Sequence, residues 1–220
     1  MLKSGLLKLV AVVAVTSLVL VGCGSSKKND TSNDKSDVKV EAPAELPIAT
    51  IKVKGYGDIV AELYPQYAPN TVNNFISLAN SGFYDGLTFH RVIQNFVLQG
   101  GDPDGNGTGG PGYAIRGEFT ENNYKHNTLS HSAGVLSMAR SRNNDSAGSQ
   151  FFIVTEDSEM NKASLDNKYA GFGKVIEGMD VVTKIAAVKT DGMDKPEEPV
   201  VIESIRVDTK GVDYKDPEKM

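Results

Sequence analysis

The sequence has no tryptophan, one cysteine and three histidines among its 220 residues. The single thiol, Cys23, cannot form a disulfide within the chain, so the fold does not depend on disulfide bonds. It also excludes zinc and iron–sulfur sites that need several cysteine ligands. His126 and His131 are five residues apart, which is not the spacing of a helical zinc pair. We therefore expect no metal site and no cofactor.

The sequence also lacks a net positive charge and a long apolar run at its start. The formal charge of −5 at pH 7 argues against a general nucleic-acid binder. An uncharged, mostly apolar run covers Leu9 to Val21, which is shorter than the roughly 20 residues that a membrane-spanning helix needs. Its length is typical of a signal-peptide core, and Lys3 and Lys8 provide the short basic start.

The run ends in Leu20-Val21-Gly22-Cys23, which resembles the lipobox of bacterial lipoproteins. We therefore expect residues 1–22 to be a lipoprotein signal peptide, and Cys23 to become the acylated N-terminus, carrying fatty acids such as palmitate. More than one acyl chain would anchor the protein durably at the extracytoplasmic face of the cell membrane. The alternatives are an ordinary signal peptide with a chance cysteine and an uncleaved anchor.

Composition divides the rest of the chain into three segments. Residues 23–47 have mixed charges and few apolar side chains, so we expect a disordered tether that starts at the lipidated cysteine. Residues 48–208 contain the patterned part of the sequence and are expected to form one domain. Residues 209–220 are predicted to be a polar C-terminal tail.

Short strand-like runs recur through the predicted domain, at 48–54, 58–64, 87–98, 135–139, 150–155 and 199–208. Helical periodicity appears twice. The first apolar stripe, with i, i+3, i+4, i+7 spacing, is Val72, Phe75, Ile76 and Ala79. The second is Met179, Val182, Ile185 and Ala186. Many short strands with two helices predict a mainly β fold, a closed barrel capped by two α-helices.

Several longer motifs follow one another between residues 48 and 207. They are Phe89-His90-Arg91-Val92-Ile93, Phe96-Val97-Leu98-Gln99-Gly100-Gly101-Asp102, Gly134-Val135-Leu136-Ser137-Met138-Ala139-Arg140, Ala147-Gly148-Ser149-Gln150-Phe151-Phe152-Ile153, Leu165-Asp166-Asn167-Lys168-Tyr169 and Phe172-Gly173-Lys174-Val175. Together these blocks resemble the cyclophilins. The resemblance implies an eight-stranded antiparallel barrel and peptidyl-prolyl cis/trans isomerase (rotamase) activity. It also implies a surface groove for proline-containing unfolded or extended polypeptides.

The chemistry of this reaction needs no nucleophile and no metal. Rotation about an amide C–N bond costs about 18–20 kcal/mol, because the planar bond has partial double-bond character. In the twisted transition state the nitrogen can accept a hydrogen bond, so a cation placed there stabilises the transition state more than the ground state. By resemblance Arg91 is that cation, and Gln99 hydrogen-bonds both Arg91 and the substrate. A guanidinium suits this role because it stays charged and offers several fixed donors.

The resemblance also names the residues that bind the substrate. The apolar pocket for the proline ring matches Phe96, Met138, Phe152 and Leu165, with Val97 beside it and Tyr169 at its edge. The adjoining peptide groove matches Ala139, Arg140 and Gln150. Taken singly, the apolar members would be ordinary core residues. Their joint order and spacing is what indicates a pocket.

Four positions depart from the residues common in the family. Val97 replaces a common Met, and Arg140 replaces a common Asn. Ser164 replaces a frequent Trp, and Tyr169 replaces a frequent His. We expect the cation of Arg140 to favour acidic residues next to the X-Pro unit. The missing Trp is expected to weaken binding of the inhibitor cyclosporin.

Three other features receive a structural interpretation. His90 is expected to be structural, since the mechanism gives it no acid–base role. Ser149 is not a hydrolase nucleophile, because no Gly-x-Ser-x-Gly motif surrounds it. Asp102 to Gly107 begin like an EF-hand calcium loop, but Tyr113 occupies the twelfth position, where a glutamate is required.

The sequence thus predicts a monomeric, lipid-anchored isomerase that accelerates the folding of exported proteins. One alternative is a chaperone that holds proline-containing peptides in the same groove with little catalysis. Such a binder would not need the Arg91 and Gln99 pair. Another alternative is a lipoprotein adhesin or solute-binding subunit, although the domain is small for a two-lobed solute binder.

Overall fold

A computed structural model describes residues 39–220. The predicted signal peptide, Cys23 and residues 24–38 of the predicted tether lie outside the described residues. No helix within 39–220 combines the length and the apolar character needed to cross a membrane. Pro47, the last residue of the predicted tether, is buried, and its carbonyl accepts a hydrogen bond from Leu63 N at 2.9 Å.

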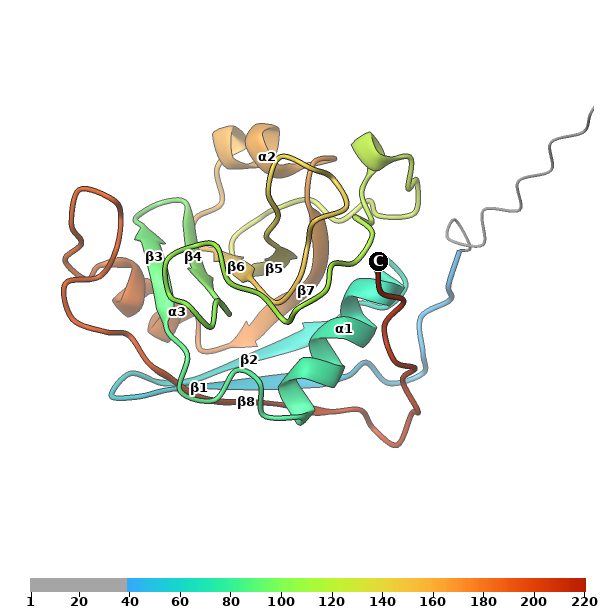
Figure 1. Cartoon of the computed structure of the whole chain (residues 1–220), viewed down its shortest axis with the longest axis horizontal. Coiled ribbons are helices and arrows are strands. Elements are labelled where there is room, and N and C mark those ends of the chain that lie inside the picture. Colours follow the sequence, from blue (N-terminus) through green and yellow to red (C-terminus); the bar gives the residue numbers. More distant parts are fainter. Residues whose placement is uncertain (1–38) are drawn as a thin grey trace, which may run out of the picture. The chain divides into compact units, whose positions relative to one another are not determined.

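Short strands and three α-helices make up the described part of the chain (Figure 1). In chain order they are β1 (Ile48–Val53), β2 (Gly57–Leu63), α1 (Pro69–Asn80), β3 (Phe89–Ile93), β4 (Val97–Gly100), the 3-10 turn η1 (Thr120–Asn122), β5 (Val135–Met138), β6 (Phe151–Val154), α2 (Glu159–Leu165), β7 (Ala170–Glu177), α3 (Met179–Ala186) and β8 (Ile202–Asp208).

The strands form one eight-stranded antiparallel sheet in the order β3-β4-β6-β5-β7-β2-β1-β8. This confirms the predicted mainly β, eight-stranded antiparallel fold. The predicted closed barrel is not confirmed, because β3 and β8 remain edge strands and the sheet is an open half-barrel. The segments next to these edges are joined by an isolated bridge between Thr88 and Val201, with backbone hydrogen bonds from Phe89 N to the carbonyl of Val200 at 2.9 Å and from Ile202 N to the carbonyl of Leu87 at 2.8 Å.

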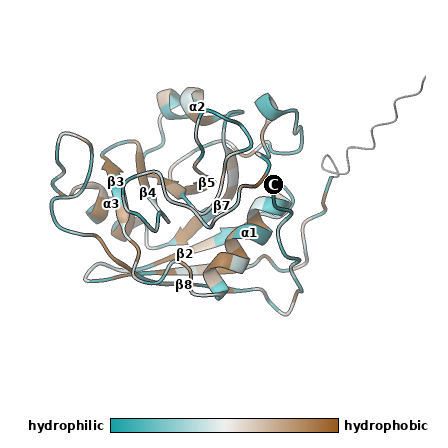
Figure 2. Ribbon diagram, viewed as in Figure 1, coloured by the Kyte–Doolittle hydropathy of each residue, from teal (hydrophilic) through white to brown (hydrophobic). Residues whose placement is uncertain are grey.

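Helix α1 follows the first predicted stripe. Pro69 occupies its first turn, where the missing N–H costs nothing, and all four stripe residues are buried. Figure 2 shows hydrophobic and hydrophilic residues alternating along α1, as an amphipathic helix requires. Phe75 contacts the rings of Phe151 and Phe172, with centroids 5.5 and 5.0 Å away, so the helix is packed onto the sheet through aromatic residues.

The second predicted helix is α3, in which Val182, Ile185 and Ala186 of the stripe are buried and Met179 is partly buried against the core. The prediction of two helices is wrong by one, because α2 also forms. Helix α2 buries only Asn161 and Leu165, so it carries no apolar stripe that periodicity could reveal.

The predicted C-terminal tail returns to the domain. Glu218 N donates to Asn70 Oδ1 at 2.7 Å, and Asn70 Nδ2 donates back to the carbonyl of Glu218 at 3.0 Å. Met220 N then donates to the carbonyl of Ala114 at 2.9 Å. The segment therefore lies against the first turn of α1 and the loop that follows Tyr113.

Candidate active site

A second apolar cluster, separate from the main core, gathers most of the predicted pocket. Its buried members are Val97, Val135, Ala139, Phe152, Val154 and Leu165, with Phe96, Leu129 and Tyr169 packed against them. Six of these nine were predicted to contact substrate. Met138 was predicted with them, but it is 1% exposed and belongs to the main core. The cluster draws on β4, β5, β6 and the end of α2, so only the fold brings its members together.

A row of side chains crosses four strands beside this cluster. Arg91 on β3 lies opposite Gln99 on β4, and Gln99 lies opposite Phe152 on β6. Ser137 on β5 lies opposite Phe152 on the other side. Directly opposed residues of antiparallel strands share one face of the sheet. The cation, the amide and an aromatic ring of the predicted site are therefore neighbours on one surface.

Gln99 is hydrogen-bonded to Gln150 rather than to Arg91. Its Nε2 donates to Gln150 Oε1 at 2.9 Å, and Gln150 Nε2 donates to the carbonyl of Gly109 at 2.9 Å. The predicted hydrogen bond between Gln99 and Arg91 is not among the hydrogen bonds of the described residues. Arg91, with 40% of its side chain exposed, instead forms an ion pair with Asp194.

The ring of Phe152 packs against the rings of His131 and Tyr169. The rings of Phe152 and His131 stack with centroids 6.1 Å apart, and Tyr169 meets Phe152 edge-on at 5.6 Å. His131 Nδ1 lies 2.8 Å from Asp166 Oδ1, and His131 Nε2 lies 2.9 Å from Ser137 Oγ.

The pKa values indicate how this polar chain is protonated. Burial lowers the pKa of His131 against the opposing effect of Asp166, so the ring is neutral at pH 7. The pKa of Asp166 lies below its usual value, because hydrogen bonds from His131 and Ser130 outweigh the effect of partial burial. Nδ1–H of the neutral ring then donates to the carboxylate, and Nε2 accepts from the Ser137 hydroxyl. Ser137 is 0% exposed, so this Ser–His–Asp chain supports the pocket and cannot act as a nucleophile.

Arg140 reinforces the other side of the pocket. Its Nε and Nη2 donate to the carbonyl of Lys168 at 3.0 and 2.8 Å, and its Nη1 donates to the carbonyl of Ser141 at 2.9 Å. The guanidinium also lies 4.7 Å from the ring centre of Tyr169 and 5.0 Å from that of Phe119. The predicted preference for acidic flanking residues would thus depend on its charge, because its three nitrogens are already hydrogen-bonded.

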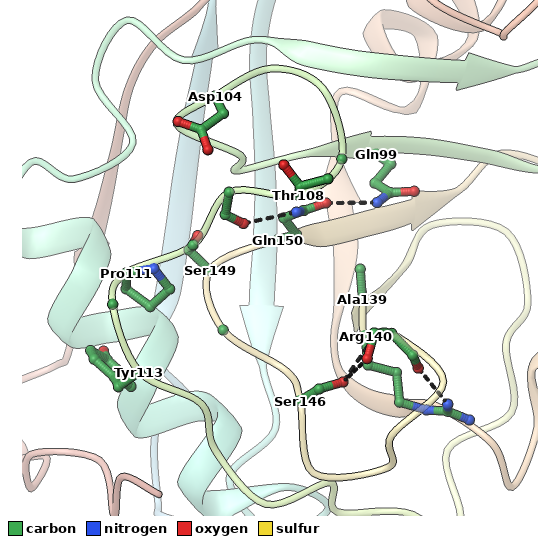
Figure 3. Close-up of a pocket in the computed structure, with 16 residues that line it drawn as sticks. Gln99, Asp104, Thr108, Pro111, Tyr113, Ala139, Arg140, Ser146, Ser149 and Gln150 are labelled. Atoms are coloured by element: carbon green, nitrogen blue, oxygen red, sulfur yellow. Dashed lines mark hydrogen bonds between the residues drawn. The ribbon is translucent and has the colours of Figure 1, made fainter.

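A cavity of about 660 Å³ adjoins the row, and Gln99 of the row lines it (Figure 3). Four predicted residues line it: Gln99, Ala139, Arg140 and Gln150. The sequence did not identify the rest of the lining, which includes Asp104, Thr108, Pro111, Tyr113 and Ser146. These residues belong to two polar loops without periodicity, so no sequence pattern marked them.

The loop from Asp104 to Tyr113, which lines this cavity, is preceded by Asp102. Asp102 is 1% exposed. Its carboxylate accepts backbone N–H groups from Asp104, Asn106 and Gly107. These hydrogen bonds hold its pKa below the usual value, against the opposing effect of burial. A Cβ at Gly109 would overlap Asp102 Oδ1, which the backbone hydrogen bonds hold in place, so only glycine fits there. The motif that resembled a calcium loop is therefore a turn built around one carboxylate.

Two further observations concern metal and acid–base chemistry. Within residues 39–220 no group of three or more histidine, cysteine, aspartate or glutamate side chains is placed to hold a metal ion. His90 is buried, and burial lowers its pKa. Neither ring nitrogen of His90 has a hydrogen-bond partner among the described residues, so its structural role stays a prediction.

Comparison with known proteins identifies the same region. A family model described as cyclophilin type peptidyl-prolyl cis-trans isomerase/CLD matches residues 48–207. Peptidyl-prolyl cis-trans isomerase B of Bacillus subtilis (strain 168) is 56% identical over 119 residues, which cover 54% of this chain and 76% of that protein. Peptidyl-prolyl cis-trans isomerase CYP71 of Arabidopsis thaliana is 41% identical over 193 residues, covering 83% of this chain. The chain spans only 29% of the length of that plant protein.

A solved structure has the same architecture. It is the crystal structure of a cyclophilin type peptidyl-prolyl cis-trans isomerase from Cryptosporidium parvum in the presence of the dipeptide Ala-Pro. It aligns with a TM-score of 0.65 and 32% sequence identity, covering 73% of this chain and 98% of that chain.

Proposed function

The chain belongs to the family of cyclophilin-type peptidyl-prolyl cis-trans isomerases, and we propose that it accelerates X-Pro rotation by stabilising the twisted amide with Arg91. The observation that carries this proposal is the row Arg91, Gln99 and Phe152 across β3, β4 and β6. The row sets a charged donor and an aromatic ring on one face, next to the apolar cluster that contains Phe152.

The surroundings of each group indicate which part of the substrate it binds. The apolar cluster takes the proline ring, because it is lined by Val97, Phe152 and Leu165 and is separate from the main core. The groove at Gln150 and Ala139 takes the residues next to the proline in extended form. The guanidinium of Arg91 then meets the prolyl nitrogen as it becomes pyramidal, where a preorganised charge contributes most to the rate.

A protease-coupled isomerisation assay on an Ala-Pro peptide tests this mechanism. We expect the wild-type chain to accelerate isomerisation, and Arg91→Ala to reduce kcat/KM by about 10²–10³, the usual loss for one transition-state donor. Arg91→Lys keeps the charge but not the planar donor set, so it should recover part of the activity. A folded Arg91→Ala variant with unchanged kcat/KM would refute the role of Arg91. A folded wild-type chain that binds the peptide without catalysis would favour the chaperone.

We also propose that the domain works outside the cytoplasm on exported proteins, anchored by lipid on Cys23. The support lies in the sequence, where the one cysteine follows a short apolar run and Leu20-Val21-Gly22. Uncatalysed X-Pro isomerisation takes tens to hundreds of seconds, so a tethered isomerase would shorten a slow step of folding after export. Cys23→Ala should abolish incorporation of a palmitate analogue and move the protein out of the membrane fraction. Labelling of the variant at the wild-type level would exclude this anchor.

A further inference from the structure

The cation of the active site has a partner that comes from a distant part of the sequence. Arg91 Nε lies 3.4 Å from Asp194 Oδ2, and the two side chains are 40% and 44% exposed. The strand that carries Arg91 is also attached to this loop, because Val92 N donates to the carbonyl of Asp194 at 2.8 Å. The contact thus combines an ion pair with a backbone hydrogen bond one residue away.

Asp194 lies in a hydrogen-bonded turn between Asp191 and Lys195. Its φ is 64°, a left-handed conformation that few residues other than glycine, asparagine and aspartate adopt. The carboxylate of Asp191 accepts N–H groups from Met193 at 2.8 Å and Lys195 at 3.0 Å. Asp191 N donates to the carbonyl of Lys195 at 2.8 Å, which closes the turn. The backbone that carries the Asp194 side chain is therefore held by hydrogen bonds within the loop.

The geometry of the pair leaves the useful donors of Arg91 free. Arginine has one N–H on Nε and four on its two terminal nitrogens. Asp194 approaches Nε, so the terminal nitrogens remain available to a substrate. An arginine side chain has about 2 kcal/mol of rotamer entropy, and a fixed carboxylate at Nε restricts that freedom. Because both side chains are partly exposed, solvent screens the carboxylate and the guanidinium keeps its charge.

We propose that Asp194 is a positioning residue, which holds the Arg91 guanidinium in the orientation that meets the prolyl nitrogen. This inference depends on the catalytic role proposed for Arg91. The carboxylate makes no contact with the reacting bond in this account and acts only through Arg91.

Asp194→Asn is the variant that isolates this effect. Asparagine also accepts a left-handed φ, so the turn and its backbone hydrogen bond to Val92 are kept while the charge is lost. Exposed ion pairs contribute about 0.2–1 kcal/mol, so we expect kcat/KM to fall about 1.5- to 5-fold at low salt. The ratio of wild type to variant should approach one near 1 M salt, where the Debye length is about 3 Å. A purely structural defect would not respond to salt in this way.

Two controls complete the experiment. Asp180→Asn removes an equivalent carboxylate, paired with Lys184 at 2.8 Å on α3, and should leave kcat/KM unchanged. Asp194→Asn is also made in the Arg91→Ala background, where no cation from residue 91 faces Asp194, and there it should cause no further loss of the residual kcat/KM.

Each outcome decides between the hypotheses. Equal kcat/KM for wild type and Asp194→Asn at low salt overturns the proposal. So does an equal loss in the Arg91→Ala background, because the effect would then not pass through Arg91. If Arg91→Ala alone keeps full activity, the catalytic role of Arg91 fails, and the Asp194 proposal fails with it for that separate reason. A salt-dependent loss that vanishes in the Arg91→Ala background supports the proposal.

Discussion

We predict that Glu118 makes the stability of this protein depend on pH. Its side chain is 5% exposed, and its carboxylate accepts backbone N–H groups from Asn70 at 3.0 Å and Thr71 at 2.8 Å. It therefore caps the first turn of α1 from a distant part of the chain. Burial raises the pKa of Glu118 from 4.5 to about 7, although these hydrogen bonds act in the opposite direction.

The sign and size of the effect follow from linkage. Because the pKa is raised in the folded state, the contribution to stability is fully present below pH 4.5 and is lost as the pH rises through about 7. Each pKa unit is worth about 1.4 kcal/mol, so the unfolding free energy should fall by about 2–3 kcal/mol between pH 5 and pH 8. That change is a large part of the stability of a typical domain.

Urea unfolding of the wild type and Glu118→Gln between pH 5 and pH 8 measures the contribution of Glu118 to the unfolding free energy. Glutamine does not ionise, so it changes the free energy by an amount that is the same at every pH. The difference between the two proteins should therefore move by about 2–3 kcal/mol across this range. Glu203→Gln, at an exposed position of β8, serves as the control and should run parallel to the wild type. Parallel curves for Glu118→Gln would refute the reasoning.

Three further substitutions test the supports of the site. Asp166→Asn removes the charge that accepts from the buried His131, so it should cost about 1.5–3 kcal/mol of unfolding free energy and raise KM in the coupled assay. An unchanged KM would show that the His131 ring is oriented without it. Phe152→Ala should cost about 3–5 kcal/mol and weaken Ala-Pro binding in calorimetry, and full affinity would place the proline ring elsewhere. Gly109→Ala would force a Cβ against Asp102 Oδ1. This substitution should weaken the binding of longer peptides more than the binding of Ala-Pro. Equal losses of affinity for both would contradict a groove separate from the proline pocket.

The sequence was sufficient where one segment carries its own periodic signal. The stripe from Val72 to Ala79 predicted α1, because a helix shows its buried face at intervals that the sequence alone reveals. Ordered motifs likewise predicted that Phe96, Phe152 and Leu165 lie together, and the three share one apolar cluster. The same reasoning missed α2, which has too few apolar residues to show a period.

Only the tertiary structure decided which polar groups meet. Asp194 reaches Arg91, Asp166 reaches His131 and Glu118 reaches the start of α1 across long stretches of chain. Such contacts involve single residues in loops, so they leave no periodic pattern in the sequence. The curvature of the sheet is decided in the same way, because whether β3 and β8 pair along their length depends on the register of every strand between them. The residue types of the site are thus written in the sequence, while their orientation and support come from the fold.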